Sequence, residues 1–248
     1  MYFARNIRNK ILLGVGFASN SYGFNNLSLS EWDFNWDCPD KETKGIHYIV
    51  LVRHGQYSSG KDDDVDRVLT SLGQKQATAT GIRLKEILEA NNIPKINRMY
   101  HSTMIRAKQT SDIILSHLPV KLDQPGQYQP CSMIREGACF RPIPSISKER
   151  WNVSDKDFFR DEPRIEAAFK YHIHRADNDE SYSTILVCHG NVIRYIVCRA
   201  LQLNPEAWLR FSVANSSITI LKIMPSGNVS LVSMGESGHM KPQEITFN

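Results

Sequence analysis

Two short runs of apolar residues have the length and composition of buried β-strands. Residues 47–52 read His-Tyr-Ile-Val-Leu-Val, and residues 184–188 read Thr-Ile-Leu-Val-Cys. Consecutive apolar positions rich in β-branched residues are typical of parallel strands that helices cover on both faces. Each run is followed closely by a histidine and a glycine, and the glycine permits a tight turn. We therefore expect two central strands that end in the same kind of turn.

Segments with helical spacing of apolar residues alternate with these strands. Residues 72–88 carry an apolar stripe, Thr70 is a suitable N-cap, and Asn91–Pro94 ends the helix. This alternation predicts an α/β domain of three layers, α/β/α, with a mostly parallel sheet. The other predicted elements are strands at 99–100 and 217–223, helices at 104–115, 164–175 and 192–201, a hairpin turn at 225–228, and a loop-rich stretch at 120–161.

The length of 248 residues fits one globular domain with a short additional segment. Residues 46–248 are predicted to form the domain, and residues 31–45 a linker. Residues 1–30 have basic side chains at positions 5, 8 and 10, an apolar run, many Ser and Asn residues, and no acidic residue. This pattern predicts a mitochondrial targeting segment or a weak membrane anchor. A disordered tail and a secretory signal are the alternatives.

Charge and cysteine content narrow the class of partner and the compartment. The formal net charge is +4, and no basic run with interleaved aromatics is present, so we expect no nucleic acid partner. A mildly positive protein suits a phosphorylated or otherwise anionic substrate. The five cysteines form no C-x-x-C pair, which argues against a disulfide framework or a zinc ribbon and favours a reducing compartment.

Two histidines and two arginines are placed for phosphate chemistry. Arg53 and His54 follow the first apolar strand, and His189 follows the second. The carboxyl ends of neighbouring parallel strands meet at one edge of a sheet, where α/β proteins bind their ligands. Arg106 lies near the start of a predicted helix, and its guanidinium can bind two phosphate oxygens. Either histidine alone would suggest a structural role, but together they predict one anion pocket.

Four motifs occur in order along the chain: Leu51-Val52-Arg53-His54-Gly55, Leu69-Thr70-x-x-Gly73, Ser102-x-x-x-Arg106-Ala107 and Val187-Cys188-His189-Gly190. As an ordered set, they resemble the histidine phosphatase superfamily, which includes phosphoglycerate mutases and many phosphatases. The resemblance covers about residues 46–235. It implies the phosphoglycerate mutase-like fold and catalysis through a phosphohistidine, with no metal and no other cofactor.

Longer runs point to one group within that superfamily. They are Trp32-Asp33-Phe34-Asn35-Trp36-Asp37, Ile134-Arg135-Glu136-Gly137-Ala138, and residues 164–169, 171–176 and 191–201. These runs resemble the mitochondrial serine/threonine-protein phosphatases called phosphoglycerate mutase family member five. The resemblance implies hydrolysis of phosphoserine and phosphothreonine in proteins, at mitochondria, with the outer membrane as the candidate location. It also implies a phosphoprotein partner, with a MAP kinase kinase kinase of stress signalling, activated by dephosphorylation, as the candidate substrate.

The resemblance assigns a role to each site residue. His54 attacks phosphorus and becomes phosphorylated, and it has to be neutral to do so. Arg53 and Arg106 bind the phosphoryl group and disfavour a further positive charge on His54. Glu136 protonates the departing Ser or Thr oxygen and then activates the hydrolytic water; the alternative for Glu136 is a solvated side chain with no role. His189 stabilises the equatorial oxygens as charge shifts.

The aromatic motif at residues 32–37 needs a separate explanation. Two tryptophans in a polar segment are expected to pack against protein rather than remain in water. In the resembled family, the motif drives assembly of a homo-oligomer and activates the enzyme by docking on a neighbouring subunit. Packing on its own domain is the alternative. The candidate assembly residues are Trp32, Asp33, Asn35, Trp36 and Asp37.

Two other functions stay open. A small-molecule phosphatase or phosphoglycerate mutase would share the motifs, although mutases have Glu after Arg-His-Gly where this chain has Gln56. A mitochondrial scaffold that uses the aromatic motif is the other alternative, and the presence of all the expected catalytic residues disfavours it.

The acidic run 62–66 lacks the spacing and glycine of a calcium loop. We expect a solvated loop there, which could lie near the entrance of the site and influence substrate choice.

Overall fold

The structure is a computed structural model, and it describes residues 31–147 and 152–247. Residues from Asp33 onward form one compact unit. Within the described residues, the sheet has six strands in the order β3-β2-β4-β1-β5-β6. Only β5 runs against the others, because it pairs antiparallel with both β1 and β6 while the remaining pairs are parallel. The strands are β1 (His47–Arg53), β2 (Ile96–Ser102), β3 (Tyr128–Cys131), β4 (Tyr182–Cys188), β5 (Ile218–Ile223) and β6 (Val229–Glu236).

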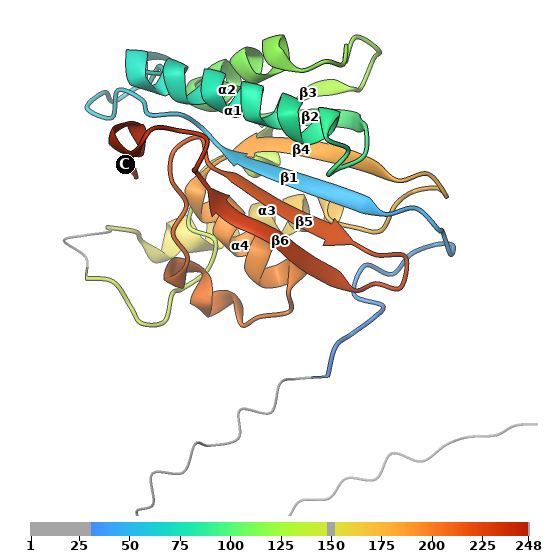
Figure 1. The fold of residues 1–248 in the computed structure, drawn as a ribbon. Coiled ribbons are helices and arrows are strands. Elements are labelled where there is room, and N and C mark those ends of the chain that lie inside the picture. The colour runs from blue at the N-terminus through green and yellow to red at the C-terminus, as the bar shows by residue number, and fades with distance from the viewer. Residues whose placement is uncertain (1–30, 148–151, 248) are drawn as a thin grey trace, which may run out of the picture. The chain divides into compact units, whose positions relative to one another are not determined.

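Helices cover both faces of this sheet (Figure 1). On one face, α1 and α2 pack on Val50 and Val52 of β1; on the other, α3 and α4 pack on Ile49 and Leu51 of the same strand. Successive side chains of a strand point to opposite faces, so an apolar residue at every position is required here. The helices are α1 (Ser71–Glu89), α2 (Ile105–His117), α3 (Asp155–His172) and α4 (Gly190–Ala200), with 3-10 helices at Asp64–Asp66, Ser132–Ile134, Pro205–Arg210 and Pro242–Glu244.

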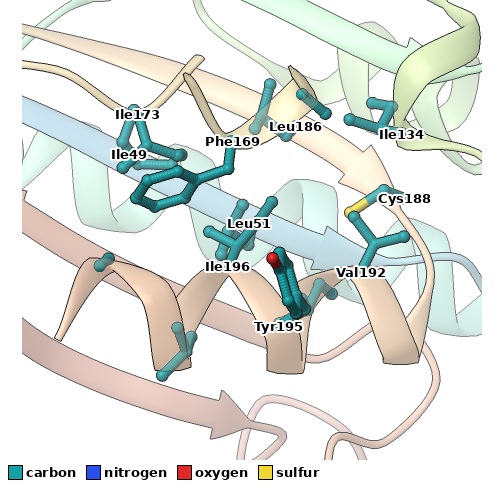
Figure 2. Close-up of a cluster of buried hydrophobic side chains, with 14 of the residues drawn as sticks. Ile49, Leu51, Ile134, Phe169, Ile173, Leu186, Cys188, Val192, Tyr195 and Ile196 are labelled. Carbon is teal, nitrogen blue, oxygen red and sulfur yellow. The ribbon is translucent and has the colours of Figure 1, made fainter. Parts of the chain in front are cut away.

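The apolar core between the sheet and α3/α4 fixes where the two central strands end. Figure 2 shows Leu51 of β1 and Leu186 of β4 in one cluster with Phe169 of α3 and Ile196 of α4. A register slip of one residue would move these side chains to the other face of the sheet, so the register is strongly specified. In that register, Arg53 pairs with Cys188. Residues 54 and 189 therefore leave the sheet next to each other.

The predicted three-layer architecture with a mostly parallel sheet is confirmed. Two elements are longer than the sequence pattern predicted, and one strand was not predicted. β2 extends over 96–102 rather than 99–100. β3 lies in the stretch predicted to be loop-rich, because it is a short edge strand with a proline and one buried residue. α3 begins at Asp155 rather than at about residue 164, since Ser154 and Asp157 form a capping box. Pro163 inside the helix concealed this start, because proline is disfavoured in helix interiors.

Only part of the predicted N-terminal region lies among the described residues. Residues 1–30, the predicted targeting segment or anchor, lie outside the described residues. Among the residues that are described, no helix is both long enough and apolar enough to cross a membrane. The predicted linker contacts the domain, because Thr43 Oγ1 donates to Ala176 O at 2.9 Å and Lys44 N–H donates to Asp179 Oδ1 at 3.0 Å. The boundary at residue 46 stays a prediction.

Candidate active site

The carboxyl ends of β2, β4 and β1, which are neighbours in the sheet, deliver the predicted site residues to one place. His54 follows β1, His189 follows β4, and Arg106 lies in the first turn of α2, just after β2. The rings of His54 and His189 are 5.0 Å apart between centroids. Arg106 Nε lies 3.3 Å from His54 Nε2. The structure therefore brings His54, His189 and Arg106 together at the edge where α/β proteins bind ligands.

His54 is held in the state that a nucleophile requires. Its Nδ1 lies 2.8 Å from Gly55 O, and a carbonyl can only accept, so Nδ1 carries the proton and the lone pair is on Nε2, where it accepts the Arg106 Nε–H. Burial, and then the positive charges of Arg106 and Arg53, lower the pKa of His54 well below its usual value. The imidazole is therefore neutral at physiological pH, with its lone pair on Nε2.

The backbone around His54 is fixed from several sides. The His54 N–H donates to Cys188 O at 3.0 Å. The Gly55 N–H donates to Thr110 Oγ1 at 3.0 Å, and Asn215 Nδ2 donates to His54 O at 3.2 Å. Gly73 of α1 explains the Thr-x-x-Gly motif, because a Cβ there would lie 1.9 Å from Gln56 O. Helix α1 can pack this closely on the catalytic loop only with glycine at that position.

Both predicted phosphate-binding arginines are buried beside His54. Arg53 is 8% exposed, and its Nη1 donates to Val213 O at 2.8 Å. Burial lowers the pKa of Arg53 to about 10, so the guanidinium is still charged at neutral pH. Arg106 is 3% exposed, and it stacks on the ring of Tyr57 at 4.6 Å. Two buried cations close together create a pocket of positive potential that suits a phosphoryl group.

His189 is fully buried, and one of its ring nitrogens has no hydrogen-bond partner among the described residues. Its Nε2 lies 2.8 Å from Ser102 Oγ at the end of β2. Its Nδ1 is buried without a hydrogen-bond partner among the described residues. Burial, followed by the charges and dipoles of His54, Arg106 and Arg53, lowers the pKa of His189 well below its usual value. A buried ring nitrogen of this kind is suited to a ligand atom, because leaving a polar group unpaired is costly.

Glu136 reaches the same site from the loop that follows β3. Burial raises the pKa of Glu136, although the Gly137 N–H and the charges of Arg53, Arg106 and Arg194 oppose that shift. A carboxyl group with a raised pKa can act as a general acid near neutral pH. Arg164 of α3 holds this loop in place by donating to Met133 O at 2.7 Å, to Arg135 O at 2.8 Å and to Glu136 O at 3.2 Å.

Four further residues lie at the site, and sequence reasoning gave none of them an individual role; only the acidic run that contains Asp64 was expected to influence substrate choice. Ser102 orients His189, and Tyr57 lies edge-on to His54 at 5.2 Å besides stacking on Arg106. Asp64, from the acidic run expected to be solvated, forms an ion pair with Arg106. Arg194 of α4 lowers the pKa of Glu136 through its charge. Helical spacing gave the only available signal for Arg194, because it lies one turn after the buried start of α4 at His189-Gly190.

The predicted assembly residues that pack on the domain lie away from this site. Trp36 Nε1 donates to Gly227 O at 2.8 Å, and the indole contacts the ring of Phe169 at 5.8 Å. The Asp37 side chain is 2% exposed and forms an ion pair with Arg175 at 2.6 Å. Burial opposes ionisation of Asp37, but the bonds and charge of Arg175 lower its pKa. Trp36 and Asp37 thus dock on their own domain.

The other members of the motif are more exposed. Asp33 N–H donates to Gln202 Oε1 at 2.9 Å, while Asp33 O accepts from Gln202 Nε2 at 2.8 Å. Asn35 N–H donates to Asp33 Oδ1 at 2.8 Å. Trp32 is half-buried. In the part of the chain that the structure describes, no group of three or more His, Cys, Asp or Glu residues is arranged to hold a metal ion.

Comparison with known proteins places these residues in a family. Residues 49–125 and 159–235 match the model of the histidine phosphatase superfamily (branch 1). The chain is 40% identical over 271 residues to the mitochondrial serine/threonine-protein phosphatase PGAM5 of Xenopus laevis, which covers 95% of this chain and 94% of the relative. It is 48% identical to the protein of the same name from Xenopus tropicalis, over 82% of this chain and 69% of that protein.

Solved structures with the same architecture include a phosphoglycerate mutase from Plasmodium falciparum. That structure is 32% identical in sequence, has a TM-score of 0.53, and covers 79% of this chain and 92% of its own. The family match and the two frog relatives extend over most of the chain. The chain therefore belongs to the histidine phosphatase superfamily and, within it, to the family of serine/threonine-protein phosphatases that these relatives represent.

Proposed function

We propose that this protein hydrolyses phosphoserine and phosphothreonine in proteins through a phosphohistidine on His54. One observation carries the proposal. A neutral imidazole, with its proton fixed on Nδ1 by Gly55 O, presents the Nε2 lone pair between two buried arginines. That combination provides a nucleophile and the positive charge needed to bind the group it attacks.

In the first step, His54 Nε2 forms a bond to phosphorus in line with the bond to the Ser or Thr oxygen, which breaks. Glu136, whose pKa burial raises, delivers a proton to the departing oxygen from its protonated form. Arg53 and Arg106 neutralise the equatorial oxygens. His189 can donate from its unpartnered Nδ1 to a phosphoryl oxygen while its Nε2 accepts from the Ser102 hydroxyl.

In the second step, water replaces His54 on phosphorus. Glu136 is now a carboxylate and takes a proton from the attacking water, the bond between phosphorus and Nε2 breaks, and inorganic phosphate leaves. His54 returns to the neutral tautomer that Gly55 O favours. Each group thus ends the cycle in its starting protonation state.

The relatives support a protein substrate. Both frog proteins carry names that state serine/threonine-protein phosphatase activity and a mitochondrial location. We extend both properties to this chain, with the outer membrane as the candidate location and a phosphorylated MAP kinase kinase kinase as a candidate substrate. The similarity to a phosphoglycerate mutase favours keeping small phosphate esters as the second candidate class.

Replacing His54 with Ala should lower hydrolysis of a phosphothreonine peptide by at least about 10³-fold, because the covalent route is lost. Rapid acid-free quenching of the wild-type protein with ³²P-labelled peptide should trap label on His54, and the variant should trap none. Unlabelled 3-phosphoglycerate, assayed alongside, should turn over much more slowly than the peptide. Full activity in the variant would refute the mechanism, and faster turnover of 3-phosphoglycerate would favour a small-molecule enzyme.

Replacing Arg194 with Gln should move the alkaline limb of the pH profile of kcat/KM to higher pH. The charge of Arg194 lowers the pKa of Glu136, so its removal raises that pKa and keeps the general acid protonated at higher pH. Arg83→Gln is the matched control, since Arg83 pairs with Glu86 on the surface of α1. An unmoved limb in the Arg194 variant would mean that another group supplies the proton.

We also propose that the docking surface of Trp36 and Asp37 takes part in assembly of a homo-oligomer, in which the motif of one copy occupies this surface on another. Trp36→Ala removes the bond to Gly227 O and the contact with Phe169, and should lower both particle mass by light scattering and kcat/KM. Glu42→Ala, an exposed change in the same segment, should leave both unchanged. Unchanged mass in the Trp36 variant would contradict the assembly role.

A further inference from the structure

One carboxylate from the acidic loop lies inside the candidate active site. Asp64 Oδ1 lies 3.2 Å from Arg106 Nη1, and Asp64 Oδ2 accepts the backbone N–H of Ile105 at 3.1 Å. Ile105 is the first residue of α2, so Asp64 sits at the N-terminus of a 13-residue helix. The Asp64 side chain is 34% exposed, whereas that of Arg106 is 4% exposed. Asp64 thus approaches the buried guanidinium from the solvent side.

These two donors are the ones a phosphoryl group would use. A helix N-terminal N–H together with an arginine is a typical phosphate-binding pair. The two carboxylate oxygens of Asp64 accept from these two donors, the Ile105 N–H and Arg106 Nη1, as a bidentate anionic ligand would. The remaining nitrogens of Arg106 are also engaged, since Nε donates to His54 Nε2 and Nη2 contacts Met104 Sδ at 3.4 Å. Arg106 therefore has to exchange partners before it can hold a substrate phosphate.

The contact between Arg106 and His54 makes that exchange part of the reaction. Nε2 is the atom that must attack phosphorus, and in this arrangement its lone pair accepts the Arg106 Nε–H. A phosphoryl group that draws the guanidinium onto its own oxygens frees Nε2 at the same moment. Tyr57 keeps Arg106 nearby during the movement, because its ring stacks on the guanidinium and lies edge-on to His54.

We propose that Asp64 is an internal competitor for the phosphate site, which sets the affinity and the anion selectivity of the enzyme. This inference rests on the proposed function and concerns the same site. A phosphomonoester carries close to two negative charges at neutral pH, so it displaces a single carboxylate from the Ile105 N–H and Arg106 Nη1. Monoanions such as carboxylates or phosphodiesters lack that advantage. Asp64 thereby keeps weak anions out of a pocket that two buried arginines would otherwise make attractive to them.

The test compares inorganic phosphate binding, by calorimetry, in the full chain and in three variants. Asp64→Asn keeps an oxygen for the Ile105 N–H but removes the charge, and should tighten phosphate binding about tenfold, equivalent to about 1.4 kcal/mol. Asp64→Glu keeps the charge and should stay close to wild type. Asp63→Asn is the matched control from the neighbouring exposed position, and should leave phosphate affinity unchanged.

The same proteins are assayed for inhibition of phosphopeptide hydrolysis by phosphate and by acetate, a monoanion. Asp64→Asn should show stronger inhibition by both, with a larger gain for acetate than for phosphate. Unchanged or weaker phosphate binding in Asp64→Asn, at a wild-type melting temperature, would overturn the competitor role and leave Asp64 a positioning residue for Arg106. Absence of phosphopeptide hydrolysis in the wild type, with phosphate binding that still responds to Asp64→Asn, would refute the proposed function and retain this inference.

Discussion

The candidate site depends on one constraint: the buried imidazole of His54 stays neutral beside the buried, positively charged side chains of Arg53 and Arg106. Desolvation of His54 and the charges of Arg106 and Arg53 act in the same direction, so the ring stays unprotonated where a solvent-exposed histidine would titrate. The bond from Nδ1 to Gly55 O then decides which nitrogen is nucleophilic. The sheet register, the close packing of α1 through Gly73, and the bonds to Thr110 and Asn215 all serve to hold this one ring.

The same arrangement concentrates buried positive charge at the site. Arg53 and Arg106 are less than a tenth exposed, and burying like charges together is unfavourable without compensating anions. Val213 O and the Tyr57 ring supply partial compensation, Asp64 supplies a full charge to Arg106, and Glu136 interacts favourably with both arginines. A phosphoryl group completes the set. In the proposed function, a phosphoryl group binds to this buried positive charge, and in the proposed role of Asp64, its carboxylate competes with other anions for the same donors.

The residues at strand ends were predictable because their positions follow from topology. Two apolar runs that each end near His-Gly are sufficient to predict that His54 and His189 meet, since parallel neighbours end at the same edge. Arg106 was predictable because it lies in the first turn of a helix next to that edge. Glu136 could be assigned only by family resemblance, because the position of a loop residue depends on contacts such as those of Arg164 with the carbonyls around it. Asp64 and Arg194 act through space on residues distant in sequence; helical spacing places Arg194 near the start of α4, but no periodicity indicates which residues the two side chains approach.

The central claim is that His54 is neutral and carries its proton on Nδ1, and ¹⁵N-detected NMR of imidazole-labelled protein tests it directly. The account predicts that the His54 nitrogens keep the shifts of the Nδ1–H tautomer between about pH 7.5 and about pH 5.5, where an ordinary histidine becomes charged. In Arg106→Met, which removes a charge that lowers the pKa, protonation should begin at higher pH than in the wild type. An imidazolium signal from wild-type His54 near neutral pH, or a proton on Nε2, would contradict the account.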